Sequence, residues 1–292
     1  MVQTQAAHLI ANAKVNLTLS VTGRDKDSYH QLVSAVCFTD FGDALTIMPA
    51  DETRLSYQGA FAQQLQQAGG DTLLAAAADL ADSRLLHHIT LEKNIPLGGG
   101  LGGGSADAAA YLRYLSADWP AAKISALRDA SVRLGADVPA CFDNMCHIMA
   151  GRGEQAHAVS LMTDNHPVMV LTNPLCHADT GAVFGAFAKS GVGFSECNPA
   201  DIAALITKGA WGDVMAIGND LTYAACQLYP QIGQLLDEMA QAGTMIGNDF
   251  IAHAMTGSGA SCFALLQNKD AAQAYQKSLA EKNIWAQVTD FF

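Results

Sequence analysis

Three features of the chain predict an α+β fold. Apolar and polar residues alternate over short segments in the first half, which is typical of strands with one buried face. Helical spacing dominates the second half, and strands and helices do not follow one another in regular pairs. We expect two domains, at 1–158 and 159–292, because the loop around Gly151, Arg152 and Gly153 interrupts the pattern in a chain of 292 residues.

The strands are predicted by alternation. The first is expected over 8–22, where apolar residues from Val15 to Val21 alternate with polar ones. Further strands are expected at 32–38, 44–48, 87–92, 168–172, 263–267 and 286–289. A turn at Gly42 and Asp43 would separate the strands 32–38 and 44–48.

The helices are predicted by composition, spacing and end signals. They are expected at 71–86, 105–115, 124–134, 179–189, 199–206, 219–228, 230–242 and 271–281. Asp71 or Thr72 would begin the first of these helices, and Ser105 would be the N-cap of the second. Gly135 would close the third.

Composition limits the possible partners. Half of the residues are hydrophobic and only 15% are charged, which suits a well-buried core. A net charge of −12 argues against nucleic acid as a partner, because phosphate backbones are bound by clustered lysine and arginine. The seven cysteines are scattered without a CxxC pair, which is typical of a reduced, cytoplasmic protein. No signal peptide or membrane span is expected, so we predict no membrane partner.

The segment 96–110 reads PLGGGLGGGSADAAA, with six glycines in seven residues directly before a predicted helix. Glycine loses the most backbone freedom on folding, so such a run is expected where the backbone must wrap something closely. The free N–H groups and positive dipole at a helix start form a ready site for phosphate. The run therefore predicts a phosphate-binding turn.

Three other interpretations of the glycine run are less favourable. Gly98, Gly100 and Gly103 satisfy GxGxxG, but a dinucleotide-binding fold would place this pattern in its first strand–helix turn, usually near the start of a domain. A Walker loop requires a lysine after the glycines, and none follows here. A flexible loop without a ligand would not lead directly into a helix.

The run resembles the second motif of the GHMP kinases, the superfamily of galactokinase, homoserine kinase and the mevalonate kinases. The segment ANAKVNLTL at 11–19 resembles the first family motif, and MTGSGASCF at 255–263 resembles the third. The resemblance implies a two-domain GHMP kinase architecture, with the active site in the cleft between the domains. It also implies ATP and Mg²⁺ as cofactors. The ATP-binding residues that it implies are Lys93, Pro96, Gly98, Gly99, Gly100, Leu101, Gly102, Gly103, Gly104 and Ser105.

Further segments resemble one branch of this family, whose members phosphorylate a cytidine diphosphate derivative of methylerythritol in the non-mevalonate route to isoprenoids. These segments are AKVNL at 13–17, DSYH at 27–30 and LGADVP at 134–139. The resemblance implies transfer of phosphate from ATP to the 2-hydroxyl of that small molecule. The chain departs from the branch at Ser28, where a glycine is usual, and at Thr72, where many members carry an asparagine for adenine contact.

Two catalytic residues are expected, Lys14 and Asp137. A lysine among the apolar residues of a strand is costly unless it is paired. Asp137 precedes Pro139, which favours an extended Val138 and a stiff turn. From the residues alone, an exposed lysine on an edge strand and a turn-forming aspartate remain open. The resemblance implies that Asp137 accepts the proton of the substrate hydroxyl and that Lys14 orients Asp137.

The resemblance also implies a set of substrate-binding residues. Tyr29 and Phe184 would stack on the cytosine, and His30 would bind its edge, although without the resemblance these would be two core residues and a surface histidine. The full set is Asn16, Tyr29, His30, Asp137, Thr180, Phe184, Gly257 and Ser258. We expect Asp107 to face outward or to lie near the metal, since the sequence contains no dedicated metal cage.

Two other functions stay open. One is a different GHMP kinase, acting on homoserine or a mevalonate derivative, which the DSYH segment and Phe184 disfavour. The other is a GHMP-fold nucleotide sensor without turnover, which the presence of both Lys14 and Asp137 disfavours. A monomer and a homodimer are both compatible with the sequence.

Overall fold

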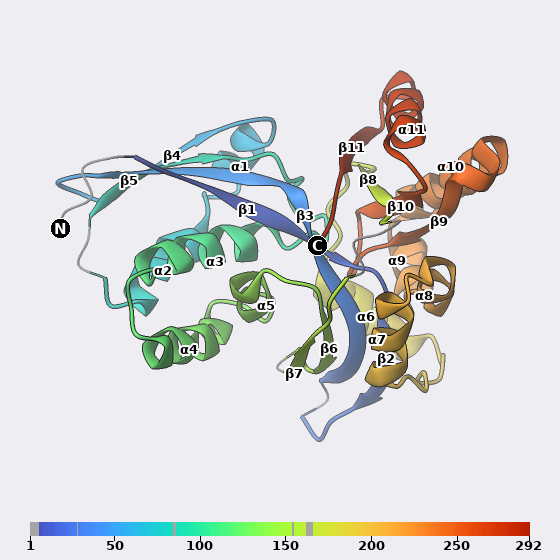
Figure 1. Cartoon of the computed structure of the whole chain (residues 1–292), viewed down its shortest axis with the longest axis horizontal. Helices are drawn as coiled ribbons and strands as arrows, with labels where there is room; N and C mark the ends of the chain where they lie inside the picture. Colours follow the sequence, from blue (N-terminus) through green and yellow to red (C-terminus); the bar gives the residue numbers. More distant parts are fainter. Residues whose placement is uncertain (1–5, 28, 84–85, 154, 162–165) are drawn as a thin grey trace. The chain divides into compact units, whose positions relative to one another are not determined.

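Helices and strands both contribute to the fold, which confirms the α+β prediction (Figure 1). The computed structural model describes residues 6–27, 29–83, 86–153, 155–161 and 166–292. The chain forms two compact units that are discontinuous in sequence. The first unit contains 1–14, 41–97 and 102–144, and the second contains 15–40, 98–101 and 145–292. The linear division at residue 158 and the cleft between domains stay predictions.

In the first unit, a sheet is built from four strands. β5 (His87–Glu92) pairs antiparallel with the second half of β3 (His30–Pro49), and β4 (Arg54–Gln58) pairs parallel with β5. β1 (Ala7–Asn16) pairs with β3. Every second residue of β5 is buried, which is the pattern of a strand with one covered face. Figure 1 shows helices α2 (Thr72–Leu80) and α3 (Gly103–Leu115) along this sheet.

The predicted turn at Gly42 and Asp43 is wrong, because both residues lie within the continuous strand β3. A Cβ atom on Gly42 would lie 2.2 Å from the carbonyl oxygen of Ala11, so glycine is required there by the close approach of β1. The buried Asp43 carboxylate accepts hydrogen bonds from the backbone N–H groups of Asn94 (2.6 Å) and Ile95 (2.8 Å). Gly42 and Asp43 are residue types that are common in turns, but here they make contacts with distant segments of the chain.

The other helices of the first unit follow the predictions only in part. Asp71 is the N-cap of α2, and its carboxylate accepts a hydrogen bond from the N–H of Leu74 at 2.8 Å. The remaining helices are α1 (Ala62–Gln67), α4 (Ala121–Ala130), η1 (Ser131–Arg133) and α5 (Val138–Asp143). The short strand β4 and the helices α1 and α5 are not among the predicted elements.

In the second unit, a four-stranded antiparallel sheet has the order β11 (Trp285–Thr289), β8 (Val168–Asn173), β10 (Cys262–Leu266) and β9 (Phe250–Met255). A second group of strands pairs the first half of β3 with β2 (Ser20–Arg24) and with β6 (His147–Gly151), which in turn pairs with β7 (Gln155–Ala158). The predicted single strand over 8–22 is thus two strands, β1 and β2.

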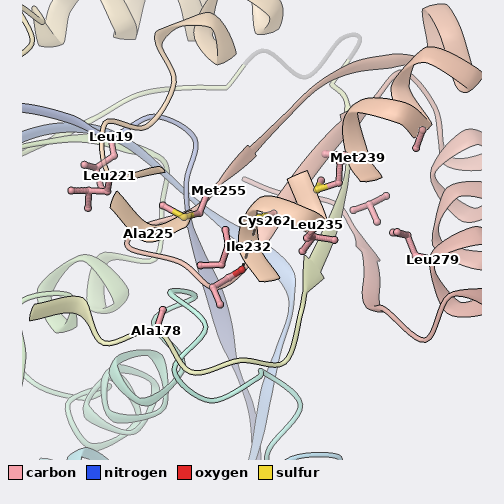
Figure 2. Close-up of a cluster of buried hydrophobic side chains, with 14 of the residues drawn as sticks. Leu19, Ala178, Leu221, Ala225, Ile232, Leu235, Met239, Met255, Cys262 and Leu279 are labelled. Carbon is pink, nitrogen blue, oxygen red and sulfur yellow. Dashed lines mark hydrogen bonds between the residues drawn. The ribbon is translucent and has the colours of Figure 1, made fainter. Parts of the chain in front are cut away.

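The helices of the second unit enclose its apolar core. They are α6 (Thr180–Lys189), α7 (Pro199–Thr207), α8 (Trp211–Ile217), α9 (Thr222–Leu228), α10 (Pro230–Ile246), η2 (Gly247–Asp249) and α11 (Lys269–Glu281). Figure 2 shows part of this core, where Ile232, Leu235 and Met239 of α10 pack with Met255 and Cys262 of the sheet. This packing supports the loops that carry the candidate site residues of the second unit.

Candidate active site

Lys14 and Asp137 form an ion pair in the first unit. The Nζ atom of Lys14, near the end of β1, lies 2.9 Å from Oδ1 of Asp137. The Lys14 side chain is 5% exposed and that of Asp137 is 37% exposed, so the lysine lies behind a carboxylate that solvent can reach. The pairing removes the cost that an isolated buried lysine would carry.

Asp137 is held at the start of α5. It is the residue directly before the helix, and Pro139 occupies the first helical turn, where the missing N–H of proline costs nothing. The expectation of an extended Val138 is wrong, because Val138 opens the helix. The turn is nevertheless short and stiff, which restricts where the carboxylate can lie.

The start of α3 differs from the prediction. The helix begins at Gly103, with Gly102 as its N-cap at φ +65°, and Ser105 lies within the first turn, so Ser105 is not the N-cap. This left-handed conformation suits glycine and is strained for most other residues. In the described part of the chain no side chain caps this helix end, and its first N–H groups are free for a ligand. A Cβ on Gly102 would lie 3.3 Å from Cβ of Lys14, so the ion pair is next to the helix start.

The first three glycines of the run belong to the second unit and pack against the other glycine turn, 256–261. The N–H of Ser261 donates to the carbonyl of Gly99 at 2.9 Å. A Cβ on Gly100 would lie 2.6 Å from the Gly259 oxygen and 2.9 Å from the Thr256 oxygen. These glycines are therefore required by backbone packing, independent of any ligand. The predicted ATP-binding residues Pro96 and Leu101 have buried side chains.

Lys93 lies in a buried ionic cluster of the first unit. Its Nζ atom is 2.5 Å from Oδ2 of Asp43 and 2.6 Å from Oδ2 of Asp107, and both carboxylates are fully buried. Burial alone would lower the pKa of Lys93, but the charges of Asp107 and Asp43 outweigh it and raise that pKa. The amine pairs with these two carboxylates, and its contact with ATP stays a prediction.

Asp107 does not face outward, which corrects one part of the expectation for this residue. It is completely buried, and its Oδ1 atom has no hydrogen-bond partner among the described residues. Burial raises the pKa of Asp107, and the neighbouring charges of Asp43 and Asp71 act in the same direction, while Lys93 opposes them. The carboxylate is enclosed with Lys93 and is not open to a metal ion from solvent.

A magnesium cage is not formed by the residues that the structure describes: no group of three or more histidine, cysteine, aspartate or glutamate side chains there could hold a metal. Magnesium commonly keeps several waters and binds one or two carboxylates together with substrate phosphates. The side chains fit a metal that arrives with the nucleotide better than a resident metal.

Four of the predicted substrate-binding residues come together in the second unit. Thr180 and Ser258 are joined by a hydrogen bond of 2.9 Å between their hydroxyl oxygens. A Cβ on Gly257 would lie 3.5 Å from Oδ1 of Asn16. The backbone N–H of Asn16 donates to the Thr256 hydroxyl at 2.8 Å, which ties β1 to the same glycine turn.

The predicted cytidine-binding residues contact other protein side chains, and their contacts with cytosine stay a prediction. His30 stacks on Phe184, with ring centroids 5.2 Å apart and planes 26° apart, and its buried Nε2 atom has no hydrogen-bond partner within the described part of the chain. Burial, followed by the charge of Arg24, lowers the pKa of His30. Tyr29 is 62% exposed and contacts Arg152 rather than Phe184. Ser28 lies outside the described residues.

Phe184, which stacks on His30, and Thr180, which bonds to Ser258, connect the aromatic residues with the residues around the glycine turn 256–261. They are four residues apart on α6, so their side chains lie on the same side of that helix. The second unit thus carries a continuous series of candidate residues from His30 through Phe184 and Thr180 to Ser258. Thr72, the first residue of α2, is exposed, and its contact with adenine stays a prediction.

Sequence reasoning missed two residues beside the glycine turns. Asn219 donates from Nδ2 to the carbonyls of Met255 (2.9 Å) and Gly257 (2.8 Å), which supports the second turn. His177 is exposed, and its Nδ1 atom lies 1.9 Å from the position a Cβ on Gly98 would take. No local pattern identifies either residue, because both contacts are made across the fold.

A lysine–aspartate pair beside an uncapped helix start suits transfer of a phosphoryl group, and the family comparison agrees. The model for the GHMP kinases N terminal domain matches residues 71–145, and the model for the GHMP kinases C terminal domain matches 202–284. The chain belongs to the GHMP kinase family and is an ATP-dependent kinase. This confirms the resemblance seen in the three motifs.

Individual relatives narrow the class. The chain is 37% identical to the 4-diphosphocytidyl-2-C-methyl-D-erythritol kinase of Parvibaculum lavamentivorans, over 96% of both chains. It is 39% identical to the protein of that name from Rhodopseudomonas palustris, over 96% of this chain and 92% of the relative. A crystal structure of 4-(cytidine 5'-diphospho)-2C-methyl-D-erythritol kinase superposes with a TM-score of 0.75 at 28% identity, covering 98% of this chain and 99% of that one.

Other solved structures bear on the fold alone. The mevalonate kinase of Methanococcus jannaschii superposes with a TM-score of 0.65 at 12% identity, over 99% of both chains.

Among the described residues, no helix combines the length and the apolar character needed to cross a membrane.

Proposed function

We propose that this chain transfers the γ-phosphoryl group of ATP to the 2-hydroxyl of 4-diphosphocytidyl-2-C-methyl-D-erythritol, giving the 2-phosphate and ADP in the non-mevalonate route to isoprenoid precursors. The observation that carries the proposal is the Lys14–Asp137 pair next to the uncapped start of α3. The similarity to the two relatives, which extends over nearly the whole chain, supports the choice of substrate.

The proposed chemistry begins with the substrate hydroxyl beside Asp137. The hydroxyl oxygen forms a bond to the γ-phosphorus, the bond from that phosphorus to the β,γ-bridging oxygen breaks, and the hydroxyl proton passes to the Asp137 carboxylate. Lys14 donates to Oδ1 of Asp137 at 2.9 Å. Lys14 therefore orients the carboxylate and supplies positive charge near the reacting oxygens. Positioning and electrostatic stabilisation are the main contributions an enzyme makes to phosphoryl transfer.

The start of α3 is the proposed site for the ATP phosphates. The N–H groups of Gly103, Gly104 and Ser105 lack partners within the helix and lie at its positive end. The chain has a net charge of −12, so backbone dipoles are a suitable source of positive potential for a polyanion. Mg²⁺ bound to the ATP phosphates would neutralise part of their charge.

The proposed nucleoside site is in the second unit. The unpartnered Nε2 atom of His30 would form a hydrogen bond with the cytosine edge, and Tyr29 and Phe184 would provide aromatic surface. Asn16, Thr180 and Ser258 would contact the remaining part of the substrate.

We further propose a cytoplasmic enzyme that acts as a monomer or homodimer without nucleic acid, with domains at 1–158 and 159–292.

A parallel assay of ADP release tests the substrate. The wild-type chain would be supplied with ATP, Mg²⁺ and one of three acceptors: the cytidyl substrate, homoserine or mevalonate. We expect ADP release with the cytidyl substrate to exceed release with the other two by orders of magnitude. Turnover of homoserine or mevalonate alone would assign a different kinase, and binding of ATP without ADP release from any acceptor would indicate a sensor.

A further inference from the structure

The turn that carries Tyr29 is held by one carboxylate. Asp25 follows β2, and its backbone N–H donates to the carbonyl of Tyr29 at 2.9 Å. Oδ1 of Asp25 accepts hydrogen bonds from the backbone N–H groups of Asp27 (2.9 Å) and Tyr29 (3.0 Å). This is the local hydrogen-bonding pattern by which aspartate stabilises a turn. The backbone of Tyr29 is therefore ordered by Asp25.

Arg152 completes this turn from a different strand. Leu32 of β3 pairs with Gly151 at the end of β6, which brings the next residue, Arg152, beside the turn. Its Nε atom lies 2.5 Å from Oδ2 of Asp25, and its Nη2 atom lies 2.6 Å from Oδ2 of Asp27. Each pair is at least partly exposed and would be weak alone, but the planar guanidinium satisfies both in a single orientation.

The same guanidinium covers the ring of Tyr29. Its central carbon lies 4.6 Å from the ring centroid, which is within the range of a cation–π interaction. An exposed tyrosine side chain without such a contact would lose rotational freedom on binding a ligand, and this loss would weaken affinity. With one ring face held by Arg152, the other face can stack on an aromatic base.

We infer that Arg152 is a positioning residue for the nucleoside part of the substrate and acts through Tyr29. The inference rests on the proposed function, since it assumes that Tyr29 stacks on a base. Arg152 orders the ring before the cytidine diphosphate group binds, so its loss raises KM for that substrate and leaves the phosphoryl-transfer step unchanged. Lysine does not replace it, because a single ammonium group cannot bind both carboxylates in a planar fork and stack on the ring.

A double-mutant cycle tests this inference. The variants are Arg152→Gln, Tyr29→Ala and the double variant, each assayed for kcat and for KM of the cytidyl substrate and ATP. We expect Arg152→Gln to raise KM for the cytidyl substrate about three- to tenfold, with kcat and KM for ATP within about twofold of wild type. In the Tyr29→Ala background the same change would have less than about a twofold effect, because the residue it acts through is absent.

Two further variants control for charge and folding. Arg152→Lys keeps the positive charge and should resemble Arg152→Gln. Arg128→Gln removes a surface arginine that pairs with Asp143 in the first unit and should leave both KM values unchanged. An unaltered KM in Arg152→Gln, or an equally large effect with and without Tyr29, would overturn the inference while the proposed function stands. A wild-type chain that fails to turn over the cytidyl substrate would instead refute the proposed function, and the inference with it.

Discussion

At the scale of single residues, two groups of lysine and aspartate in the same unit differ in exposure. Lys93 and its partners Asp43 and Asp107 are all buried, so this cluster holds segments together. Lys14 is equally buried, but its partner Asp137 is 37% exposed. Only the second arrangement combines a fixed carboxylate with access for a substrate hydroxyl, which is the reason for assigning the chemistry to Lys14 and Asp137.

His30 is expected to contribute to binding at a cost to stability. Its buried Nε2 atom has no hydrogen-bond partner in the residues that the structure describes, and burying an unpaired polar group costs about 1–3 kcal/mol. His30→Phe would keep the aromatic contact with Phe184 and remove this atom. We expect KM for the cytidyl substrate to rise about tenfold, with the free energy of unfolding unchanged or increased.

The control for this prediction is His253→Phe, which changes a histidine that also contacts a phenylalanine ring, Phe250, at 5.8 Å. Both KM values should stay at wild-type levels in that variant. If His30→Phe binds the cytidyl substrate as well as wild type does, the imidazole has no part in recognising the base.

At the scale of elements, the two halves of the glycine run have different reasons for being glycine. Gly100 has φ +74° and no room for a Cβ beside the second glycine turn. Gly104 lies inside α3, and a Cβ there would meet nothing closer than 3.6 Å. Packing therefore accounts for Gly100, whereas it does not account for Gly104, for which we propose the close approach of a ligand.

Alanine substitutions separate these two roles. Gly104→Ala should leave the protein as stable as wild type, or more stable by up to about 1 kcal/mol, while KM for ATP rises at least severalfold. Gly100→Ala should lower the free energy of unfolding by about 1–3 kcal/mol through backbone strain and overlap. Urea unfolding and ATP kinetics measure both effects. An unchanged KM for ATP in Gly104→Ala would place the phosphates away from this part of the helix.

The buried cluster of Lys93 is expected to stabilise the connection between β3, β5 and α3. Lys93→Met would leave two buried carboxylates without their counter-charge, so we expect the free energy of unfolding to fall by about 3–5 kcal/mol in urea titrations. Arg128→Met breaks a more exposed pair and should cost about 0–1 kcal/mol. A loss of less than about 1 kcal/mol in Lys93→Met would contradict this account of the cluster.

The local sequence pattern predicted helices and strands best where one face of the element is buried. β5 and α6 lie close to their predicted bounds because alternation, helical spacing and an aspartate N-cap all act within the segment. β3 was mispredicted because Gly42 and Asp43 look like a turn, and only their contacts with Ala11 and with 94–95 explain them. Contacts between distant segments leave no periodic signal in the sequence.

At the scale of the whole molecule, the motifs identified the family, but within each unit contacts between distant segments bring the candidate site residues together. Lys14 and Asp137 are 123 residues apart, and Asn16 contacts Thr256 across 240 residues. The resemblance to the family predicts Lys14, Asn16 and Asp137 as site residues. The sequence pattern alone also allows Lys14 to be an exposed lysine on an edge strand and Asp137 to be a turn-forming aspartate. Asn219, which carries no motif, could be found only from the structure.

Acid should destabilise the folded chain through histidines that are partly or fully buried. Burial lowers the pKa of His30, His87, His166 and His253, whereas unfolded histidines titrate at about 6.5. As pH falls through 6.5, the unfolded state takes up protons that the folded state excludes. The free energy of unfolding therefore decreases, by at most about 1.4 kcal/mol per pH unit for each histidine.

His87→Gln isolates the contribution of His87 to the pH dependence of the free energy of unfolding. The raised pKa of Asp107 acts in the opposite direction, but it does so in both proteins and therefore cancels in the comparison. Glutamine can still bind the Tyr111 hydroxyl, which lies 2.8 Å from Nδ1 of His87. Urea midpoints at pH 7.5, 6.5 and 5.5 should fall less in His87→Gln than in wild type. Parallel pH dependence in the two proteins would show that His87 titrates normally in the folded state.

The central claim is that Asp137 accepts the proton of the substrate hydroxyl while Lys14 holds it in place. The most direct test is the steady-state kcat of Asp137→Asn with ATP and 4-diphosphocytidyl-2-C-methyl-D-erythritol. Asparagine preserves the size of the side chain but cannot take up the proton. We expect kcat to fall by about 10²–10⁴-fold with KM for ATP nearly unchanged. A kcat close to that of wild type would contradict the claim.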